Sequence, residues 1–329
     1  MGKSIAWLGL SLVIALASLP FEPLARASQA TNEALRNDLF SAYMTESGRC
    51  FVVGSNAILL SSTDNGRTWK HRSLGKSYET YDLYSVGFDP TGKTGWAVGQ
   101  HGTIFQTNDG GDTWQKRQSP ANDATLLKVS VLDAQTACMA GSDGTLLCTH
   151  DGGSHWTLKQ FQGFIFFDFT LTERNGAWAA GEYKTLLYSP DNGEHWQVKS
   201  GGKNTFDAPP YFSVAFGPHG DGVLTVLGPV IEQSNTGGQS WTPLVLKLSD
   251  ELYAAFSDES QKDNQFWFVG AEGSIWSLVN GQISRIQTGT LRDLTSVFVR
   301  GSQGLAVGLG GTMLRLYADG NNWKVAGIQ

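Results

Sequence analysis

A short motif that ends in tryptophan recurs along this chain and constrains its fold more than any other feature of the sequence. Four copies are nearly identical: STDNGRTW at 62–69, TNDGGDTW at 107–114, THDGGSHW at 149–156 and SPDNGEHW at 189–196. A fifth copy, SNTGGQSW at 234–241, lacks the aspartate, and a sixth is eroded around Asp319, Gly320 and Trp323. A motif that returns every 40 to 45 residues indicates a repeat architecture built from one supersecondary unit.

A glycine at the end of a short apolar segment marks the same repeat and adds a seventh copy. In five copies this marker glycine precedes the closing tryptophan by fifteen residues, as from Gly99 to Trp114. The copy at Gly228 is two residues shorter, and the copy at Gly270 has Arg285 at the tryptophan position. Such constant spacing through changing residues is typical of a repeated backbone. The seven marker glycines are Gly54, Gly99, Gly141, Gly181, Gly228, Gly270 and Gly308.

Each repeat is predicted to form four antiparallel strands. The first strands of the seven units are expected to start near residues 39, 83, 126, 167, 211, 252 and 294. The second strand ends at the marker glycine, and a three-residue loop follows whose last position, as at Gly102, needs a positive φ. The third strands are apolar at successive positions, as at Ile104 and Phe105, so both of their faces should be covered. We therefore predict an all-β fold, a seven-bladed β-propeller of four-stranded antiparallel blades.

An open β-solenoid is the alternative architecture, although its repeats are normally shorter. The sequence does not specify how a ring would close, and residues 31–38 are a candidate for an extra strand on the last blade. The tryptophans after residue 27 all fall in register with the repeat. We interpret nearly all of them as packing residues between blades rather than as a sugar-binding platform.

Residues 1–27 are predicted to be a secretory signal peptide, and residues 28–329 a single propeller domain. Lys3 gives a positive start, an apolar run follows over 5–19, and small residues at 25–27 offer a cleavage site. That run is short for a membrane span, and we expect no transmembrane segment after cleavage. No cysteine follows the run, so no bacterial lipid anchor is expected. We expect export to a periplasm, or to the equivalent of a thylakoid lumen in a photosynthetic host.

The motif S/T-x-D-x-G-x-x-W resembles the Asp-box, also called the BNR repeat. A short carboxylate can accept hydrogen bonds from the N–H groups of its own turn, the glycine supplies positive φ, and the tryptophan packs the turn onto the blade. A catalytic carboxylate is needed once and not four times, so we predict structural roles for these side chains. They are Asp64, Asp109, Asp151, Asp191, Trp69, Trp114, Trp156, Trp196 and Trp241.

The longer unit, seen best at 83–114 (LYSVGFDPTGKTGWAVGQHGTIFQTNDGGDTW), resembles the photosystem II stability/assembly factor family of exported seven-bladed propellers. The resemblance covers about residues 38–325. It implies a non-enzymatic, cofactor-free factor that binds a protein client, a subunit of a membrane or envelope complex, and assists its assembly. Photosynthetic members resemble assembly chaperones for the precursor of the D1 reaction-centre subunit. The alternative is an Asp-box carbohydrate-active hydrolase, which would need two carboxylates in an open cleft.

The formal net charge of −6 argues against a nucleic-acid partner, which would need a clustered basic face. We expect a monomer. Propeller geometry puts the Asp-box turns on one face and the second-to-third-strand loops on the other, with the starts of the innermost strands. The central mouth of that second face is the usual place for a binding site. Our candidate binding residues there are Arg36, Asp38, Asp82, His101, Lys128, Asp143, Tyr183, Lys184, Glu251, Glu272, Arg292 and Asp293.

Four of the seven residues that lead into the innermost strands are acidic: Asp38, Asp82, Glu251 and Asp293. Such a ring could bind a cation or a basic peptide, but we favour the alternative, that these side chains are ordinary polar caps of strand ends. His101 has no partner at ligand spacing, so no metal site is predicted. Lys128 replaces small or apolar residues of other repeats, and it either points into the central channel or extends out of it.

Cys138 and Cys148 flank the loop residues 142–144 symmetrically. In a three-residue loop they would lie directly opposite, with Cα atoms roughly 4.5–5.5 Å apart. That separation is within reach of a disulfide, and an exported protein can be oxidised. We predict a cross-strand disulfide between them and a free thiol at Cys50.

Overall fold

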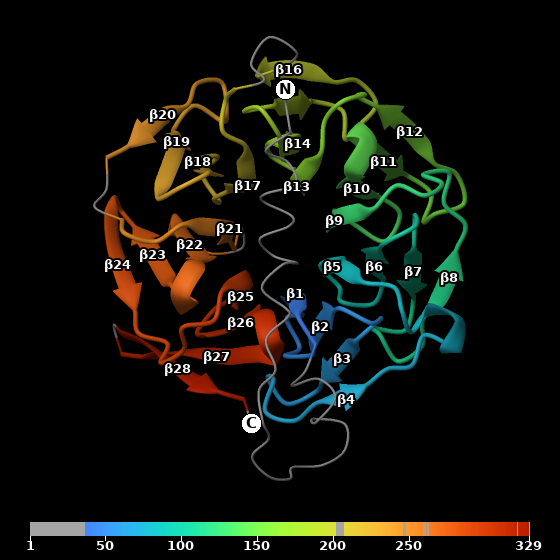
Figure 1. The fold of residues 1–329 in the computed structure, drawn as a ribbon, viewed down its shortest axis with the longest axis horizontal. Coiled ribbons are helices and arrows are strands. Elements are labelled where there is room, and N and C mark those ends of the chain that lie inside the picture. The colour runs from blue at the N-terminus through green and yellow to red at the C-terminus, as the bar shows by residue number, and fades with distance from the viewer. Residues whose placement is uncertain are drawn as a thin grey trace.

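The computed structural model describes residues 37–201, 207–245, 248–258, 261, 263–320 and 322–328. Figure 1 shows seven antiparallel sheets arranged as a ring, and each sheet contains four consecutive strands. The predicted seven-bladed β-propeller is confirmed. The predicted signal peptide and Arg36 lie outside the described residues.

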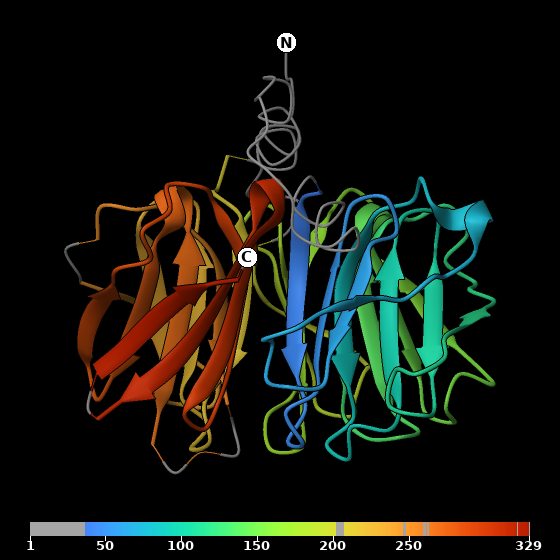
Figure 2. The same ribbon diagram turned by 90° about the horizontal axis from the view of Figure 1, so that it is seen from below.

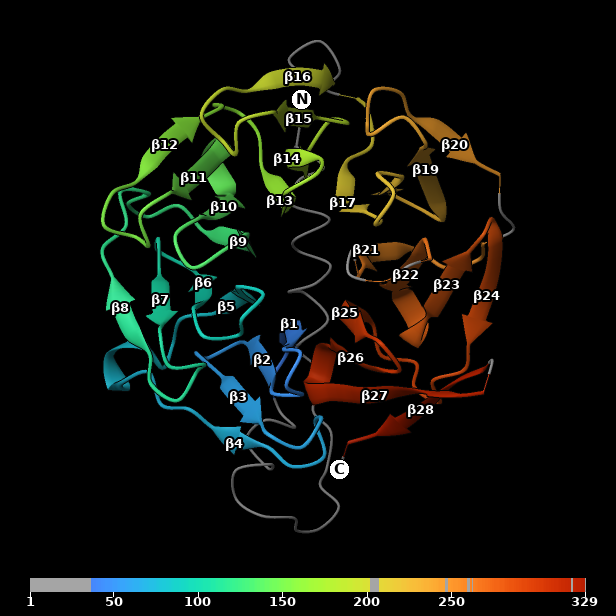
Figure 3. The same ribbon diagram turned by 180° about the vertical axis from the view of Figure 1, so that it is seen from behind.

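The innermost strand of each blade faces the central axis and begins within one residue of the position expected from the repeat (Figures 1 and 3). Figure 2 shows β1 starting near one face of the ring and pointing to the other. We call the face where these strands start the mouth face, and the opposite one the Asp-box face. The innermost strands are β1 (Leu39–Met44), β5 (Leu83–Phe88), β9 (Leu126–Val131), β13 (Phe166–Thr172), β17 (Tyr211–Phe216), β21 (Leu252–Ser257) and β25 (Leu294–Arg300).

The second and third strands form the buried middle of each blade. In blade two, every residue of both strands is buried, which agrees with apolar residues on both faces. The second strands are β2 (Cys50–Gly54), β6 (Gly95–Gly99), β10 (Ala137–Gly141), β14 (Gly176–Gly181), β18 (Gly222–Val226), β22 (Gln265–Gly270) and β26 (Gln303–Gly308). The third strands are β3 (Leu59–Ser62), β7 (Ile104–Thr107), β11 (Thr145–Thr149), β15 (Leu186–Ser189), β19 (Val230–Ser234), β23 (Ile275–Val279) and β27 (Thr312–Asp319).

The fourth strands form the outer rim and are the most exposed. They are β4 (Lys70–His71), β8 (Gln115–Arg117), β12 (Thr157–Gln160), β16 (Gln197–Ser200), β20 (Thr242–Leu244), β24 (Gln282–Ile286) and β28 (Asn322–Gly327). Four single turns of 3₁₀ helix complete the described elements: η2 (Lys76–Tyr78), η3 (Ser142–Gly144), η4 (Ala271–Gly273) and η5 (Leu309–Gly311).

Apolar side chains gather between neighbouring blades, in one cluster for each of the seven interfaces. Large residues of one blade meet the motif tryptophan of the next blade edge-on. Trp96 and Trp156 have ring centroids 5.6 Å apart, and Trp178 lies 6.2 Å from Trp241. These tryptophans therefore stabilise the ring through T-shaped aromatic contacts and burial.

The marker glycine is required by a close approach of two backbones. The residue before each innermost strand, here called the lead-in residue, accepts a hydrogen bond through its carbonyl from the N–H that follows the marker. In blade two, Gln100 N donates to Asp82 O at 3.0 Å, and a Cβ added to Gly99 would lie 2.0 Å from that same oxygen. The marker backbone is extended, with φ −175° at Gly141, so the constraint is steric and not a positive φ.

Five other marker glycines meet the same constraint. A Cβ would lie between 1.8 and 2.2 Å from the lead-in carbonyl oxygen in each of these blades. No side chain can occupy that space without moving the backbone. The five are Gly54, Gly141, Gly181, Gly270 and Gly308.

Blade five departs from the sequence-based assignment. Tyr211 pairs with Val226, as Leu83 pairs with Gly99 in blade two, so Val226 and not Gly228 occupies the marker position. Fifteen residues then separate Val226 from Trp241, as in the other copies. The valine is accommodated by a longer bond from Leu227 N to Pro210 O, 3.2 Å against 2.9–3.0 Å in the other blades.

The ring closes through side-chain contacts between the first and last blades. Ser296 Oγ accepts a hydrogen bond from Ala42 N at 3.3 Å, and Thr295 Oγ1 donates to Leu39 O at 2.6 Å. Gly310 N also donates to Asp38 Oδ1 at 2.7 Å. Among the described residues, the last blade consists of its own four strands. Residues 37–38 do not add a strand to it, and the rest of the candidate extra strand, residues 31–36, lies outside the described residues.

Replacing Gly99 by alanine should destabilise the protein by about 2 kcal/mol, because the new Cβ must displace the Asp82 carbonyl. Urea unfolding monitored by tryptophan fluorescence measures the effect. Gly327→Ala is the matched control, since nothing lies within 4 Å of a Cβ at that position. Equal stability losses in the two variants would contradict the proposed constraint.

Candidate functional site

A cavity of about 440 Å³ follows the central axis and is lined by residues of all seven innermost strands. Each of these strands contains a β-bulge directly after its first residue, as between Leu83 and Ser85. The bulge leaves one extra residue without a pairing partner and redirects its side chain. The structure therefore presents one bulge side chain per blade to the channel.

Five of the seven bulge residues are aromatic, and we call them the aromatic collar. Phe40 stacks on Tyr84 with ring centroids 5.0 Å apart, and Phe212 lies 5.7 Å from Phe167 and 6.3 Å from Tyr253. All five side chains are half-buried and line the cavity. The remaining two positions are Leu127 and Thr295.

Below the collar, side-chain oxygens link most of the innermost strands to the next one. These strands are sheet edges, so their free N–H groups need acceptors. Ser85 Oγ accepts from Val129 N at 3.2 Å, and Ser213 Oγ accepts from Ala255 N at 3.0 Å. Ser41 and Ser296 do the same for Val86 and Ala42. We call these four residues, Ser41, Ser85, Ser213 and Ser296, the serine belt.

Lys128 and Asp168 occupy two belt positions and form an ion pair inside the channel. Lys128 Nζ lies 2.8 Å from Asp168 Oδ1, and the side chains are 38% and 5% exposed. Asp168 also takes over the belt function, because its Oδ2 accepts from Val214 N at 3.0 Å and from the Ser213 hydroxyl. Lys128 thus lines the channel, and its charge is neutralised there.

The acidic ring at the mouth caps loop N–H groups of the preceding blades. Asp38, Asp82 and Asp293 each accept, through one carboxylate oxygen, a hydrogen bond from a β-loop N–H at 2.7–3.1 Å. Glu251 Oε1 accepts from Gly228 N at 3.4 Å. The capping interpretation of the acidic ring therefore holds for one oxygen of each of these carboxylates.

The second oxygen of two of these carboxylates faces the aromatic collar. Tyr84 Oη donates to Asp82 Oδ2 and Tyr253 Oη donates to Asp293 Oδ2, both at 3.4 Å. Burial, followed by the negative charge of Asp82, raises the pKa of Tyr84 to about 12. Gln100 Nε2 also donates to Asp82 Oδ2, at 3.3 Å. The collar and the acidic mouth are thus one continuous constellation.

The other candidate residues lie in the loops around the mouth. His101, Asp143, Tyr183 and Glu272 all sit in the left-handed region, with φ between 53° and 56°. The glycine predicted to need positive φ follows at Gly102, Gly144 and Gly273, so these loops use two consecutive left-handed residues.

Several of these loop side chains contact protein groups nearby. His101 Nδ1 lies 3.8 Å from Asp123 Oδ1, and Lys184 Nζ lies 2.6 Å from Glu232 Oε1. Arg292 Nη1 donates to Gly310 O at 2.8 Å. The loops therefore carry mixed charge around an acidic centre.

On the opposite face, the Asp-box carboxylates accept hydrogen bonds within their own turns. Asp64, Asp109, Asp151 and Asp191 each accept from the N–H four residues on, at 2.8–2.9 Å. In the fifth copy Thr236 Oγ1 accepts the equivalent bond from Ser240 N at 3.0 Å. The lost aspartate is thus replaced by another acceptor.

These bonds lower the pKa values of Asp-box carboxyls. Burial alone would raise the pKa of Asp109, but hydrogen bonds from Thr113 outweigh it and lower the pKa to about 2. The His155 backbone N–H is the main cause of the low pKa of Asp151, also about 2. Such carboxylates stay ionised and bonded to their turns, which suits structural staples better than proton-transfer groups.

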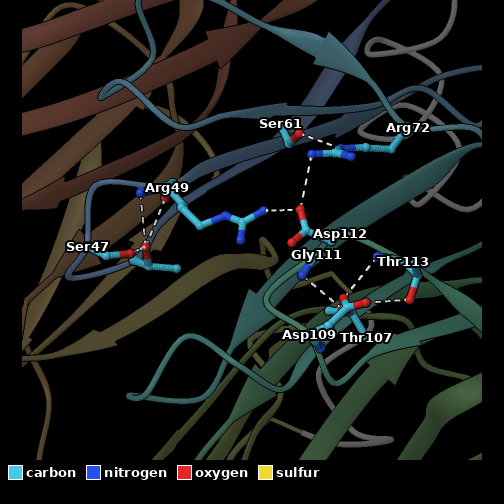
Figure 4. A network of polar contacts seen from close by, with 10 residues as sticks. Ser47, Arg49, Ser61, Arg72, Thr107, Asp109, Gly111, Asp112 and Thr113 are labelled. Carbon is cyan, nitrogen blue, oxygen red and sulfur yellow. Dashed lines mark hydrogen bonds and ion pairs between the residues drawn. The ribbon is translucent and has the colours of Figure 1, made fainter.

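A charged network joins blades one and two on the Asp-box face (Figure 4). Asp112 Oδ1 lies 2.7 Å from Arg49 Nη2 and 3.4 Å from Arg72 Nη2. Arg72 Nε also donates to Ser61 Oγ at 2.8 Å. Asp112 and its two arginine partners are all partly exposed, so these ion pairs contribute little to the stability of the fold. Their main effect is to orient the segments that carry them.

Cys138 and Cys148 are direct cross-strand partners and are joined by a disulfide, with Cα atoms 4.1 Å apart. Cys50 is a buried free thiol, and burial raises its pKa to about 12. The disulfide fills the interface position that Trp96 and Trp178 fill in other blades, and it packs against Gly193 of the next blade. It is therefore part of the inter-blade core.

The aromatic collar is the feature that the sequence analysis missed. Its signal was present, because the second position of the L-x-S-V motif is aromatic in five of seven repeats. Simple alternation does not assign that position to the channel, since the bulge shifts it. Asp168 was missed for the same reason.

Within the described ranges, no three His, Cys, Asp or Glu side chains lie close enough together to hold a metal ion. A helix long and apolar enough to cross a membrane is likewise not found in this part of the chain.

These features define the class of the protein as an Asp-box β-propeller with seven blades. The sequence model of the family described as photosynthesis system II assembly factor YCF48 matches residues 29–160. The photosystem II assembly lipoprotein Ycf48 of Synechococcus sp. (strain CC9902) is 36% identical over 73 residues, 22% of this chain and 21% of that protein. The chloroplastic photosystem II stability/assembly factor HCF136 of Arabidopsis thaliana is 34% identical over 74 residues, 22% and 18% of the two chains.

Over residues 29–160 the chain is thus similar to the Ycf48/HCF136 family of photosystem II assembly factors. Its aligned segment spans about a fifth of the length of these curated relatives.

Solved structures agree with the fold. A structure described as YCF48 bound to D1 peptide superposes with a TM-score of 0.71 and 21% identity, covering 92% of this chain and 99% of that one. YCF48 from Cyanidioschyzon merolae gives a TM-score of 0.68 and 17% identity, covering 85% and 95%. At these identities the likeness shows a shared fold.

Replacing Lys128 by serine should cost about 1–3 kcal/mol of unfolding free energy, because it leaves the buried Asp168 carboxylate without its counter-ion. The double variant Lys128→Ser/Asp168→Ser places a serine at both belt positions and removes both charges. It should therefore be destabilised by less than the sum of the single variants, with a coupling of about 1–2 kcal/mol. Urea unfolding of the four proteins completes the cycle, and additive effects would refute the pairing.

Proposed function

We propose that this chain is an exported, non-enzymatic factor that binds a protein subunit of a membrane or envelope complex through its mouth face and assists the assembly of that complex. The observation that carries the proposal is the similarity of residues 29–160 to a family whose curated relatives are described as photosystem II assembly or stability factors. A relative of the same fold is described as bound to a D1 peptide, which supports a polypeptide client.

The division of the two faces supports the mouth face as the binding surface. On the Asp-box face the recurring carboxylates are occupied by hydrogen bonds of their own turns. On the mouth face the loops differ from blade to blade and surround a cavity of about 440 Å³. Variable loops around a concave centre are typical of binding surfaces on a rigid scaffold.

Export is part of the proposal. The signal-like features of residues 1–27 and the disulfide between Cys138 and Cys148 both fit an oxidising compartment. We propose a periplasm, or the thylakoid lumen if the host photosynthesises.

A carbohydrate-active hydrolase is the competing function, and the aromatic collar is the observation that favours it, because aromatic side chains also bind sugars. The four Asp-box carboxylates are poor catalysts for the reasons above. In the channel, Asp168 is held by Lys128, Ser213 and two backbone N–H groups.

Affinity capture with tagged residues 28–329 from envelope extracts of the host tests the proposal. Wild-type protein should recover a defined envelope subunit, and the mouth-face variant Asp143→Lys/Glu272→Lys should recover several-fold less. Glu173→Lys, a charge reversal in the β13–β14 loop on the other face, is the matched control and should behave like wild type. Recovery of no specific protein, together with hydrolysis of a glycan panel, would reverse the ranking of the two functions.

A further inference from the structure

We propose that the aromatic collar and the carboxylates of Asp82 and Asp293 form a recognition site for a basic side chain, arginine in preference to lysine, on a partner polypeptide that enters the channel from the mouth face. This inference rests on the proposed function and names the chemistry by which the client would be recognised.

The collar combines the two groups that bind a guanidinium. Aromatic faces attract cations, and carboxylates pair with them. Here the two types of group touch, since the hydroxyls of Tyr84 and Tyr253 each donate to a carboxylate oxygen at 3.4 Å. A planar guanidinium can stack on an aromatic ring while its N–H groups reach a carboxylate, which a spherical ammonium does less well.

Charge around the mouth also favours a cationic guest. Asp82 and Asp293 use one oxygen each for capping, and the other oxygen faces the collar. Within the channel Asp168 neutralises Lys128, and at the mouth Arg292 donates to Gly310 O. The described part of the mouth therefore keeps an excess of negative charge.

The same channel already binds one guanidinium at its other end. Arg300 lies 5.4 Å from the ring centroid of Phe298 and 5.9 Å from that of Tyr43, and all three residues line the cavity. The collar offers comparable rings without an internal arginine among the described residues. A basic side chain from a partner would complete at the mouth the contact that Arg300 makes at the far end.

Binding of a blocked tripeptide, acetyl-Gly-Arg-Gly-amide, measured by calorimetry at low salt, tests this inference. The control peptide carries citrulline, which has the same shape without the charge. The arginine peptide should bind saturably and at least tenfold more tightly than the citrulline peptide, and its affinity should fall as salt is added. Equal binding of the two peptides would overturn the inference.

The variant Asp82→Asn/Asp293→Asn keeps an oxygen for each capped N–H and removes the charge. It should weaken binding of the arginine peptide at least tenfold while leaving the thermal midpoint of unfolding close to that of wild type. Asp133→Asn is the matched control, because Asp133 also caps backbone N–H groups, of Gln135 and Thr136, but on the Asp-box face. It should bind as wild type does.

Two further outcomes separate this inference from the proposed function. If envelope capture by the mouth face persists unchanged in Asp82→Asn/Asp293→Asn, the proposed function stands and the basic-side-chain site is wrong. If an oligosaccharide binds to the collar and the arginine peptide does not, the site recognises a glycan and the inference is overturned.

Discussion

One backbone contact organises every blade: the carbonyl of the lead-in residue accepts a hydrogen bond from the N–H that follows the marker position. It occurs in all seven blades, at 2.9–3.2 Å. It brings two backbones so close that six blades require glycine there. The bulge follows within two residues, so this contact also determines where each collar side chain begins. The geometry of the channel mouth is therefore a consequence of the repeat itself.

The repeat separates structure from recognition. Residues that recur, such as the Asp-box carboxylates and motif tryptophans, are engaged in turn hydrogen bonds and inter-blade packing. Residues that differ between copies gather at the mouth and in the channel, where Lys128 and Asp168 replace belt serines and the acidic lead-in residues meet Tyr84 and Tyr253. A ring of equivalent positions thus becomes an asymmetric surface.

Much of the fold could be predicted because spacing survives sequence change. The blade number, the strand order and the partner of Cys138 all follow from register. The sequence was misleading in blade five, where the marker position was assigned by residue type. Gly228 ends an apolar segment as the markers do, but the strand pairing puts Val226 at the marker position. The collar was not predictable from alternation, because a bulge changes which face the following side chain occupies. Capping by Asp38, Asp82 and Asp293 depends on contacts between blades that local sequence does not show.

Hydrogen exchange at the amides that bond to the lead-in carbonyls tests the central claim most directly. Although they begin surface loops, these amides should exchange as slowly as those of the middle strands, and Leu227, with the longest bond, should exchange fastest among them. Exchange at the rate of free loop amides would contradict the account. The amides to follow by NMR are those of Ser55, Gln100, Ser142, Glu182, Leu227, Ala271 and Leu309.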